Sequence, residues 1–158
     1  MQPTKVLFVC LGNICRSPMA EYLFRDMVRR RGLDMYYEVV SAATSHEEEG
    51  NAVYPAARKQ MQSVGIDMAG KYARVLTRRD YDAYDYIVGM ETRNVVNIHR
   101  ICGGDPAHKV TRLLDWSSLP RDIADPWYTG DFTKAYDEIY EGCAALLDRL
   151  EYERNSAS

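Results

Sequence analysis

The sequence predicts an α/β protein built on a parallel β-sheet, and two features support this prediction. Short, continuous apolar runs alternate along the chain with stretches in which apolar residues recur every three to four positions. The first pattern is typical of strands buried on both faces, and the second is typical of helices that cover a sheet. Strands that alternate with helices in this way indicate a parallel sheet with helices on both faces.

Four strands and five helices are expected, in alternation. The apolar runs are residues 5–9, 37–41, 86–90 and 110–114. The helical patterns cover residues 17–32, 55–65, a short segment that begins at 77, residues 95–102 and residues 132–150, and a loop is expected over residues 115–130. In a sheet of this kind ligands bind beyond the carboxyl ends of the strands, where loops lead into helices. The functional site is therefore sought in those loops.

Several residues fix where the helices begin and end. Pro18 is tolerated in the first turn of its helix, and Thr77 with Asp80 forms the sequence pattern of a capping box. The helix after residue 95 is closed by Gly103, a residue type that favours the end of a helix. These signals support the alternation of elements independently of the apolar pattern.

The chain as a whole is typical of an ordinary globular protein. Its 158 residues are expected to form one domain over residues 1–158, with 46% apolar and 27% charged residues. A net charge of −3 argues against a broad nucleic-acid interface. No stretch reaches the roughly 20 apolar residues of a membrane span. We therefore expect a cytoplasmic protein with no nucleic-acid or membrane partner.

The cysteine and histidine residues do not form a metal-binding pattern. Cys10 and Cys15 are spaced like half of a zinc site, but no second pair of ligands completes it. The three histidines are isolated from one another in the sequence. No metal ion and no cofactor is therefore expected.

Residues 10–17, CLGNICRS, lie between the first strand and the first helix and have the properties of an anion-binding loop. Such a loop directs backbone N–H groups and the positive end of a helix dipole toward one point. Gly12 gives the backbone freedom and Asn13 tolerates the left-handed conformation, so that successive amides can turn inward as a nest. Arg16 adds a planar fork that matches two phosphate oxygens. The loop therefore predicts a site for a phosphoryl group.

Cys10 lies at the base of this loop, where a positive field favours the thiolate over the thiol. A thiolate there is a nucleophile placed beneath the phosphorus, with Arg16 and the loop amides around the transferring oxygens. The Ser17 hydroxyl can donate to the sulfur. Spacing alone does not carry this prediction, because Cys143 and Arg149 are separated by the same number of residues within a helical pattern. We predict that Cys143 is a core residue.

Phosphoryl transfer from an alcohol or phenol also needs a general acid for the leaving oxygen. The histidines have no suitable setting, but Asp125 lies in a loop directly before Pro126 and is followed by Trp127 and Tyr128. Pro126 favours an extended conformation at Asp125, and the aromatic rings can form the wall of a cleft for a flat substrate. We therefore predict that Asp125 is the general acid.

Three stretches of the sequence together resemble one known family. "VLFVCLGNICRSP", "SAATS" and "DPWY" occur in the order found in the low-molecular-weight protein tyrosine phosphatases, and the resemblance covers nearly the whole chain. It implies a single domain with a four-stranded parallel sheet and helices on both faces, of the flavodoxin-like, phosphotyrosine phosphatase type I fold. It also implies hydrolysis of a phosphotyrosine-containing protein or an aryl phosphate, with inorganic phosphate as the product.

The resemblance implies a role for each residue of the expected site. Cys10 would form a phosphocysteine intermediate, Arg16 would bind phosphate, and Asp125 would protonate the leaving phenol and then activate water. The phosphate-binding loop would consist of Cys10, Leu11, Gly12, Asn13, Ile14, Cys15 and Arg16. The substrate cleft would be lined by Leu11, Ile14, Trp127 and Tyr128, and the loop would be braced by Asn13, Ser17 and Ser41. Cys15 would be able to trap Cys10 in a reversible disulfide.

Two residues depart from the pattern of that family. Lys71 stands where many members have a histidine that contacts the loop asparagine; its ammonium group can donate to Asn13 but cannot accept, and it adds a charge. Glu47 stands where many members have an aromatic residue of the cleft wall. We expect one side of the cleft to be open and acidic, so that substrates with acidic residues beside the phosphotyrosine are disfavoured.

Three alternatives remain open at the level of sequence. A phosphoarginine phosphatase of the same fold typically has threonine where this chain has Ile14. An arsenate reductase needs a further closely spaced cysteine pair, whereas Cys102 and Cys143 are far apart in the sequence. A non-catalytic redox or phosphate sensor could use Cys10 and Cys15, but it would have no need of a general acid such as Asp125.

Overall fold

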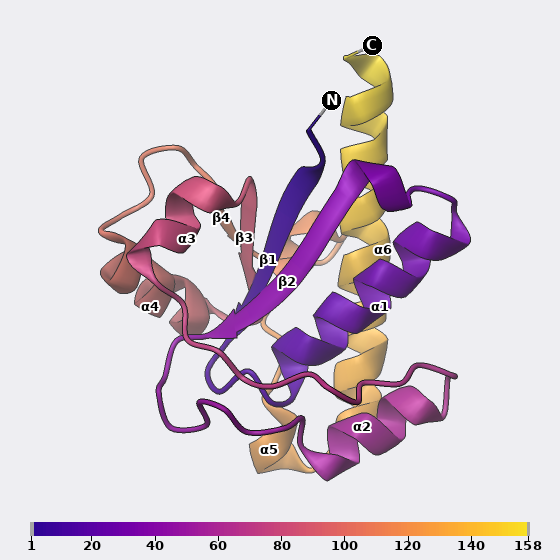
Figure 1. The fold of residues 1–158 in the computed structure, drawn as a ribbon, viewed down its shortest axis with the longest axis vertical. Helices are drawn as coiled ribbons and strands as arrows, with labels where there is room; N and C mark the ends of the chain where they lie inside the picture. The colour runs from indigo at the N-terminus through magenta and orange to yellow at the C-terminus, as the bar shows by residue number, and fades with distance from the viewer. Residues whose placement is uncertain (1, 158) are drawn as a thin grey trace.

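The computed structural model describes residues 2–157 and contains one parallel four-stranded sheet with helices on both faces (Figure 1). The strands are β1 (Thr4–Cys10), β2 (Tyr37–Ala43), β3 (Tyr86–Gly89) and β4 (Val110–Arg112), in the order β2-β1-β3-β4. In the parallel register, Val6 of β1 lies beside Val39 of β2 and beside Tyr86 of β3. The α/β class and the four parallel strands predicted from the sequence are confirmed.

The helices divide between the two faces of the sheet. One face is covered by α1 (Arg16–Arg30) and α6 (Phe132–Ser156), with α2 (Pro55–Gln62) packed against α6, and the other by α3 (Arg78–Ala83) and α4 (Thr92–Cys102) (Figure 1). A short helix, α5 (Pro126–Thr129), lies before α6. Two short 3-10 helices are η1 (Asp34–Tyr36) and η2 (Leu113–Trp116). Among the described residues no helix is long and apolar enough to cross a membrane.

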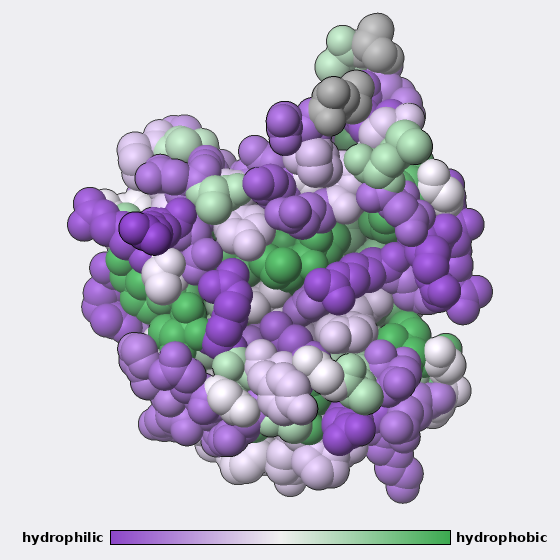
Figure 2. Space-filling model, viewed as in Figure 1, coloured by the Kyte–Doolittle hydropathy of each residue, from purple (hydrophilic) through white to green (hydrophobic). Residues whose placement is uncertain are grey.

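The strict alternation of side chains along β1 builds a separate core on each side of the sheet. Val6 and Phe8 belong to the apolar cluster that includes α1 and α6, whereas Leu7 and Val9 belong to the cluster beneath α3 and α4. All four are fully buried, which explains why the strand is apolar at every position. On the face shown in Figure 2, hydrophilic side chains cover most of the surface, and apolar ones are visible between them.

The structure changes some of the element boundaries expected from the sequence. The fourth strand ends at Arg112 rather than at residue 114, because the chain turns there into η2. Helix α2 ends at Gln62 rather than at residue 65, and Val64, which follows it, is exposed. The loop expected over residues 115–130 contains α5. The capping box was predicted correctly: the Thr77 backbone N–H donates to Asp80 Oδ2 at 2.8 Å.

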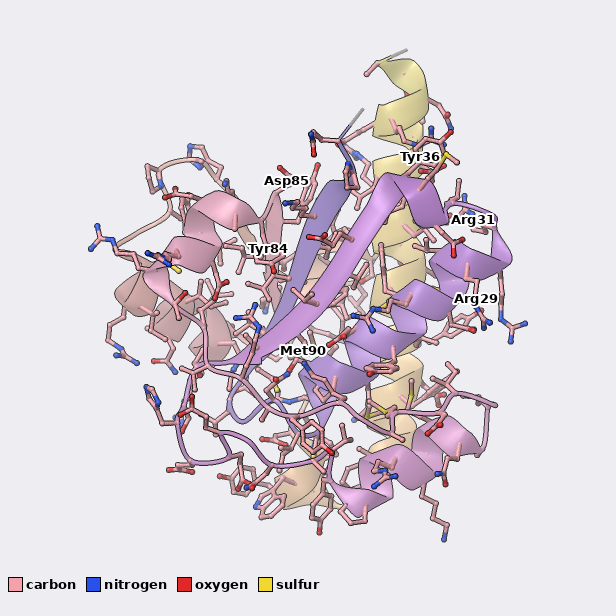
Figure 3. All side chains as sticks on the ribbon, viewed as in Figure 1. Arg29, Arg31, Tyr36, Tyr84, Asp85 and Met90 are labelled. Carbon is pink, nitrogen blue, oxygen red and sulfur yellow. The ribbon has the colours of Figure 1, made fainter. Side chains whose placement is uncertain are left out.

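The strand order places a crevice at the carboxyl ends of β1 and β3. The chain leaves β1 toward β2 and then crosses to the other side of β1 to form β3, so the loops after β1 and β3 diverge from one another. This reversal is the position at which sheets of this type bind ligands. Met90, labelled in Figure 3, directly follows the last residue of β3.

Candidate active site

The loop between β1 and α1 forms the floor of the candidate site, and its backbone is held in an unusual conformation. Asn13 has a positive φ of 58°, as its residue type predicts. Gly12 does not have a positive φ, so the freedom expected of it is not used for a left-handed turn. A Cβ atom at Gly12 would instead lie 3.3 Å from Cγ of Glu48. Glycine at position 12 therefore allows the loop after β2 to pack closely.

The carbonyl groups of the loop are turned outward. Those of Cys10, Leu11 and Ile14 accept the backbone N–H groups of Thr44, Ser45 and Tyr54, and that of Cys15 accepts Met19 N–H, at 2.9 to 3.1 Å. In a trans peptide unit the N–H group points opposite to the carbonyl group. The N–H groups that follow these four carbonyls therefore point away from the surrounding chain, which is the arrangement that an anion nest requires.

Two polar groups contact the sulfur of Cys10. The backbone N–H of Asn13 donates to Sγ at 3.3 Å, and Oγ of Ser17 lies 2.9 Å from it. The direction of the second hydrogen bond follows from its neighbours. Oδ1 of Asn13 accepts the Arg74 backbone N–H, which can only donate, so the amide nitrogen of Asn13 must face Ser17 and Ser41. Ser17 thus accepts from Asn13 and has its own hydrogen free for the sulfur, which suits a thiolate.

The same network continues beyond Asn13 to a buried ion pair. Ser41 accepts from Asn13 at 2.9 Å and donates to the carboxylate of Glu21. Glu21 is buried beside two cations, Arg25 at 2.6 Å and Lys71 at 3.2 Å. The expected contact from Lys71 to Asn13 is wrong: its ammonium group reaches Glu21 and the Ser41 carbonyl instead. The reason is that the buried carboxylate of Glu21 attracts the ammonium group more strongly than a neutral amide oxygen does.

Arg16 is almost completely buried at the start of α1, with 2% of its surface exposed. Its guanidinium donates to Glu91 Oε2 at 2.5 Å and to the Ile123 carbonyl at 2.8 Å, and it lies 3.3 Å from Asp125 Oδ2. Burial by itself lowers the pKa of Arg16, but the charges of Cys10, Asp125 and Glu91 outweigh that effect and raise the pKa. The guanidinium is therefore a permanent, oriented cation.

Asp125 reaches the site from the loop before α5. Its backbone is extended, as the following proline predicts, and its Oδ1 accepts the Trp127 backbone N–H at 3.0 Å. This hydrogen bond caps α5 and leaves Oδ2 directed to Arg16. The structure thus brings Cys10, Arg16 and Asp125 together from two segments more than 100 residues apart.

A cavity of about 110 Å³ lies over the loop. It is lined by Cys10, Leu11, Gly12, Ile14, Cys15, Arg16, Ser45, Glu47, Glu48, Asp125, Trp127 and Tyr128. Every residue expected to line the cleft is present, whereas Asn13, Ser17, Ser41 and Lys71 are absent from the lining. The expected set therefore divides into residues that face the cavity and residues that support the loop from behind.

The walls of the cavity differ in chemistry. Trp127 and Tyr128 are exposed aromatic residues, and the ring of Trp127 packs edge-on against Tyr54 with their centroids 4.8 Å apart. The lining also includes two acidic residues, Glu47 and Glu48. This arrangement can accept a flat ring against the aromatic side chains, with its charged end on Arg16.

The other cysteines lie in settings that do not favour a thiolate. Burial, and then the neighbouring charge of Cys10, raises the pKa of Cys15. Cys143 is fully buried in the core between α1 and α6, and burial raises its pKa as well. Cys102 belongs to the core on the other face of the sheet, so Cys102 and Cys143 are not a redox pair of the kind that an arsenate reductase uses. Residues 2–157 contain no group of three or more His, Cys, Asp or Glu side chains suited to a metal ion.

Sequence reasoning missed three residues of the site. Glu91 pairs with Arg16, Glu21 anchors the network behind the loop, and Tyr54 supports Trp127. Glu91 carried a usable signal, since it follows a predicted strand and the carboxyl ends of parallel strands meet at one edge. Glu21 and Tyr54 had no such signal in the sequence.

Comparisons with known proteins all point to one family. Residues 5–156 match the family "Low molecular weight phosphotyrosine protein phosphatase". The low molecular weight protein-tyrosine-phosphatase YfkJ of Bacillus subtilis is 37% identical over 151 residues, which cover 94% of this chain and 97% of that protein. The human low molecular weight phosphotyrosine protein phosphatase is 38% identical over 154 residues, with the same coverage.

Solved structures give the same result. The crystal structure of YfkJ superimposes with a TM-score of 0.93 over 97% of this chain and 98% of that one, at 36% identity. The crystal structure of DARP, a Drosophila arginine phosphatase, superimposes with a TM-score of 0.86 over 93% and 98% of the two chains, at 28% identity. On these matches, the chain belongs to the low molecular weight phosphotyrosine protein phosphatase family.

Proposed function

We propose that this phosphatase hydrolyses phosphotyrosine in proteins, or a similar aryl phosphate, through a phosphocysteine intermediate. One observation carries the proposal: a cysteine sulfur that receives two hydrogen bonds, a buried arginine and a carboxylate on that arginine all face one cavity with aromatic walls. Each group has a separate role in the reaction.

In the first step the phosphoryl group moves from oxygen to sulfur. The phosphate binds to Arg16 and the loop amides, and the Cys10 thiolate attacks phosphorus in line with the phenol oxygen. The S–P bond forms as the O–P bond breaks, and protonated Asp125 gives its proton to the departing oxygen. The products are free phenol, phosphocysteine and an Asp125 carboxylate.

In the second step water releases the phosphate. The Asp125 carboxylate accepts a proton from a water molecule that attacks phosphorus, and the S–P bond breaks with its electron pair on sulfur. The Ser17 hydroxyl stabilises the departing thiolate by its hydrogen bond. Inorganic phosphate leaves, and Asp125 is protonated again.

The residues behind the loop support this chemistry without touching the substrate. Ser17, Ser41 and Lys71 act as positioning residues, because they fix the orientation of the Asn13 amide and thereby the hydrogen bond to sulfur. The apolar side chains of Leu11 and Ile14 line the cavity next to the aromatic rings, which favours a phenyl ring over an aliphatic chain.

Phosphoarginine is the second candidate substrate. The structural similarity to an arginine phosphatase favours it, because the two chains have the same fold over nearly their whole length. Against it stands Ile14, whose side chain offers the cavity no hydroxyl group for a guanidinium phosphate. A direct comparison of substrates is therefore part of the test.

The test measures kcat/KM for phosphotyrosine, phosphoserine and phosphoarginine peptides of the same sequence, using the whole protein and two variants. We expect phosphotyrosine to be preferred, and Asp125→Ala to lower its turnover by about 10² to 10⁴-fold. Asp131→Ala is a matched control, since Asp131 also caps a helix but lies outside the cavity. A preference for phosphoarginine, or equal losses in the two variants, would contradict the proposal.

A further inference from the structure

A second cavity, of about 310 Å³, lies directly beside the phosphate cavity. The two share the lining residues Leu11, Arg16, Asp125 and Tyr128. The rest of the second cavity is formed by Glu91, Arg93, Asn94 and Thr129. A substrate whose phosphate is bound by Arg16 therefore has the second cavity next to its reacting group.

The sizes of the two cavities indicate what each can hold. A cavity of about 150 Å³ holds a single benzene molecule, so the phosphate cavity of about 110 Å³ has room for little beyond the phosphoryl group and part of its ring. The residues that flank a phosphotyrosine in a peptide must lie outside it. The larger cavity beside the start of α4 is a surface that they can reach.

The charges on the second cavity are unequally paired. Glu91 and Asp125 are both paired with Arg16, so Arg16 is already engaged and one unit of negative charge remains among these three groups. Arg93 is exposed in the first turn of α4 and forms no ion pair or hydrogen bond with any residue that the structure describes. It is the positive group of this cavity that remains available to a ligand.

The phosphate cavity has an acidic residue that the second cavity lacks. Glu47 is exposed, and its carboxylate has no partner among residues 2–157. Glu47 lines the phosphate cavity but not the second cavity, whereas Arg93 lines the second cavity but not the first. Like charges repel and unlike charges attract. An acidic side chain of a substrate is therefore repelled near Glu47 and attracted near Arg93.

We propose that the cavity beside α4 is a binding subsite for an acidic side chain that flanks the phosphotyrosine, and that Arg93 is its specificity-determining residue. This inference rests on the proposed function. The sequence led us to expect that acidic residues beside the phosphotyrosine are disfavoured. The inference restricts that expectation to the side of the phosphotyrosine that lies near Glu47. The favoured substrate is a peptide with an aspartate or glutamate on one side of the phosphotyrosine and none on the other.

The experiment measures kcat/KM for phosphotyrosine peptides in which one position at a time, on either side, is Glu, Ala or Lys. For the unmodified protein we expect Glu to raise kcat/KM by about two- to fivefold over Ala on one flank, the range of exposed ion pairs, and to lower it on the other. Arg93→Glu should make Lys the preferred residue on the first flank. The preference should weaken in 0.5 M salt, because salt screens exposed charges.

Arg100→Glu is the matched control, because Arg100 is an exposed arginine in the last turn of α4 with no ion pair to any residue from 2 to 157. It makes the same charge change on the same helix, away from both cavities. The inference is overturned if the ratio of kcat/KM for the Glu peptide to kcat/KM for the Lys peptide is the same in Arg93→Glu and Arg100→Glu. It is also overturned if the unmodified protein has no preference on either flank. Failure to hydrolyse any phosphotyrosine peptide would instead overturn the proposed function.

Discussion

The chain contains two cysteines that are each followed six positions later by an arginine, and the two pairs have entirely different surroundings. Cys10 and Arg16 lie on a loop between a strand and a helix, where the sulfur accepts an N–H group and the guanidinium is buried among carboxylates. Cys143 and Arg149 lie within α6, where the sulfur is in the core and the guanidinium pairs with Glu153 at the surface.

The two pairs show that the spacing of a cysteine and an arginine has little chemical meaning without the backbone that positions them. In a helix, six residues span more than one and a half turns, so the two side chains point in different directions. In the loop, the left-handed residue Asn13 turns the chain so that sulfur and guanidinium line the same cavity. Changes in the first pair should therefore affect catalysis, and changes in the second should affect only stability.

The largest expected effect comes from replacing each sulfur by oxygen. Cys10→Ser should lower kcat/KM for an aryl phosphate by about 10⁴-fold or more, because a serine hydroxyl at this site is not ionised and the nucleophile is lost. Cys143→Ser should leave kcat/KM within about twofold and reduce the free energy of unfolding by about 1–3 kcal/mol, as expected for a buried hydroxyl. Comparable losses of activity in both variants would remove the distinction between the two pairs.

The next effect concerns the two arginines. Arg16→Lys keeps the positive charge but loses the planar fork, and should lower kcat/KM by about 10² to 10³-fold. Arg149→Lys should change neither activity nor the free energy of unfolding by more than about 0.5 kcal/mol, because the residue is exposed. Steady-state kinetics and urea denaturation check both expectations, and a neutral Arg16→Lys would show that charge alone suffices.

A smaller effect is expected from Lys71, which acts on the sulfur through Glu21, Ser41 and Asn13. Lys71→Met should shift the acidic limb of the kcat/KM profile to higher pH, which lowers the value at pH 5.5 by about two- to tenfold and has little effect at pH 7.5. Lys71→Arg keeps a cation at this position and should have the same pH profile of kcat/KM as the unmodified protein.

Lys59→Met, on the exposed side of α2, is the control for the loss of one lysine. A uniform loss at every pH in Lys71→Met would indicate that Lys71 only stabilises the fold. A shift shared by Lys59→Met would indicate a general effect of net charge instead.

The smallest effect on activity is expected at the far end of α6, the helix that carries Cys143. There the Arg154 side chain lies over the ring of Tyr36, which is labelled in Figure 3, and donates to Glu151 at 2.7 and 2.8 Å. Hydrogen bonds from Arg154, and then from Tyr37, lower the pKa of Glu151 to about 2. The ionised Glu151 carboxylate therefore contributes its full share to the free energy of unfolding above its ordinary pKa of 4.5. This contribution is lost as the pH falls toward 2.

Glu151→Gln tests this expectation. It should reduce the free energy of unfolding by about 1–3 kcal/mol at pH 7, with the difference from the unmodified protein vanishing near pH 2, and should leave kcat/KM unchanged. Glu153→Gln, at an exposed position, should cost less than about 0.5 kcal/mol. A difference that persists undiminished at low pH would show that the packing of Glu151, and not its charge, is what matters.

The sequence predicted the features that depend on local pattern. The strands, the capping box at Thr77 and the extended backbone at Asp125 all follow from residues within a few positions of one another. The fourth strand was predicted too long, because its apolar residues Leu113 and Leu114 are buried in η2 rather than in the sheet. Apolar character reports burial but does not distinguish a strand from a 3-10 turn over so few residues.

The features that sequence did not predict depend on contacts between distant segments. Glu91 and Arg16 are 75 positions apart, and their contact exists only because β1 and β3 are neighbours in the sheet. Lys71 was assigned the wrong partner for the same reason, since no local pattern shows that Glu21 of α1 lies beside it. Long-range partners require the topology as well as the residues.

The account depends on the Cys10 sulfur being the nucleophile at the phosphate site, and alkylation with and without phosphate tests this role. The rate of iodoacetamide labelling is measured for each cysteine by mass spectrometry, in the presence and in the absence of inorganic phosphate. The ratio of the two rates is compared for each cysteine, because burial limits access to all four of them. We predict that phosphate protects Cys10, whose sulfur lies at the cavity lined by Arg16, while Cys143, in the core, resists labelling in both conditions. The account is contradicted if phosphate leaves the labelling rate of Cys10 unchanged.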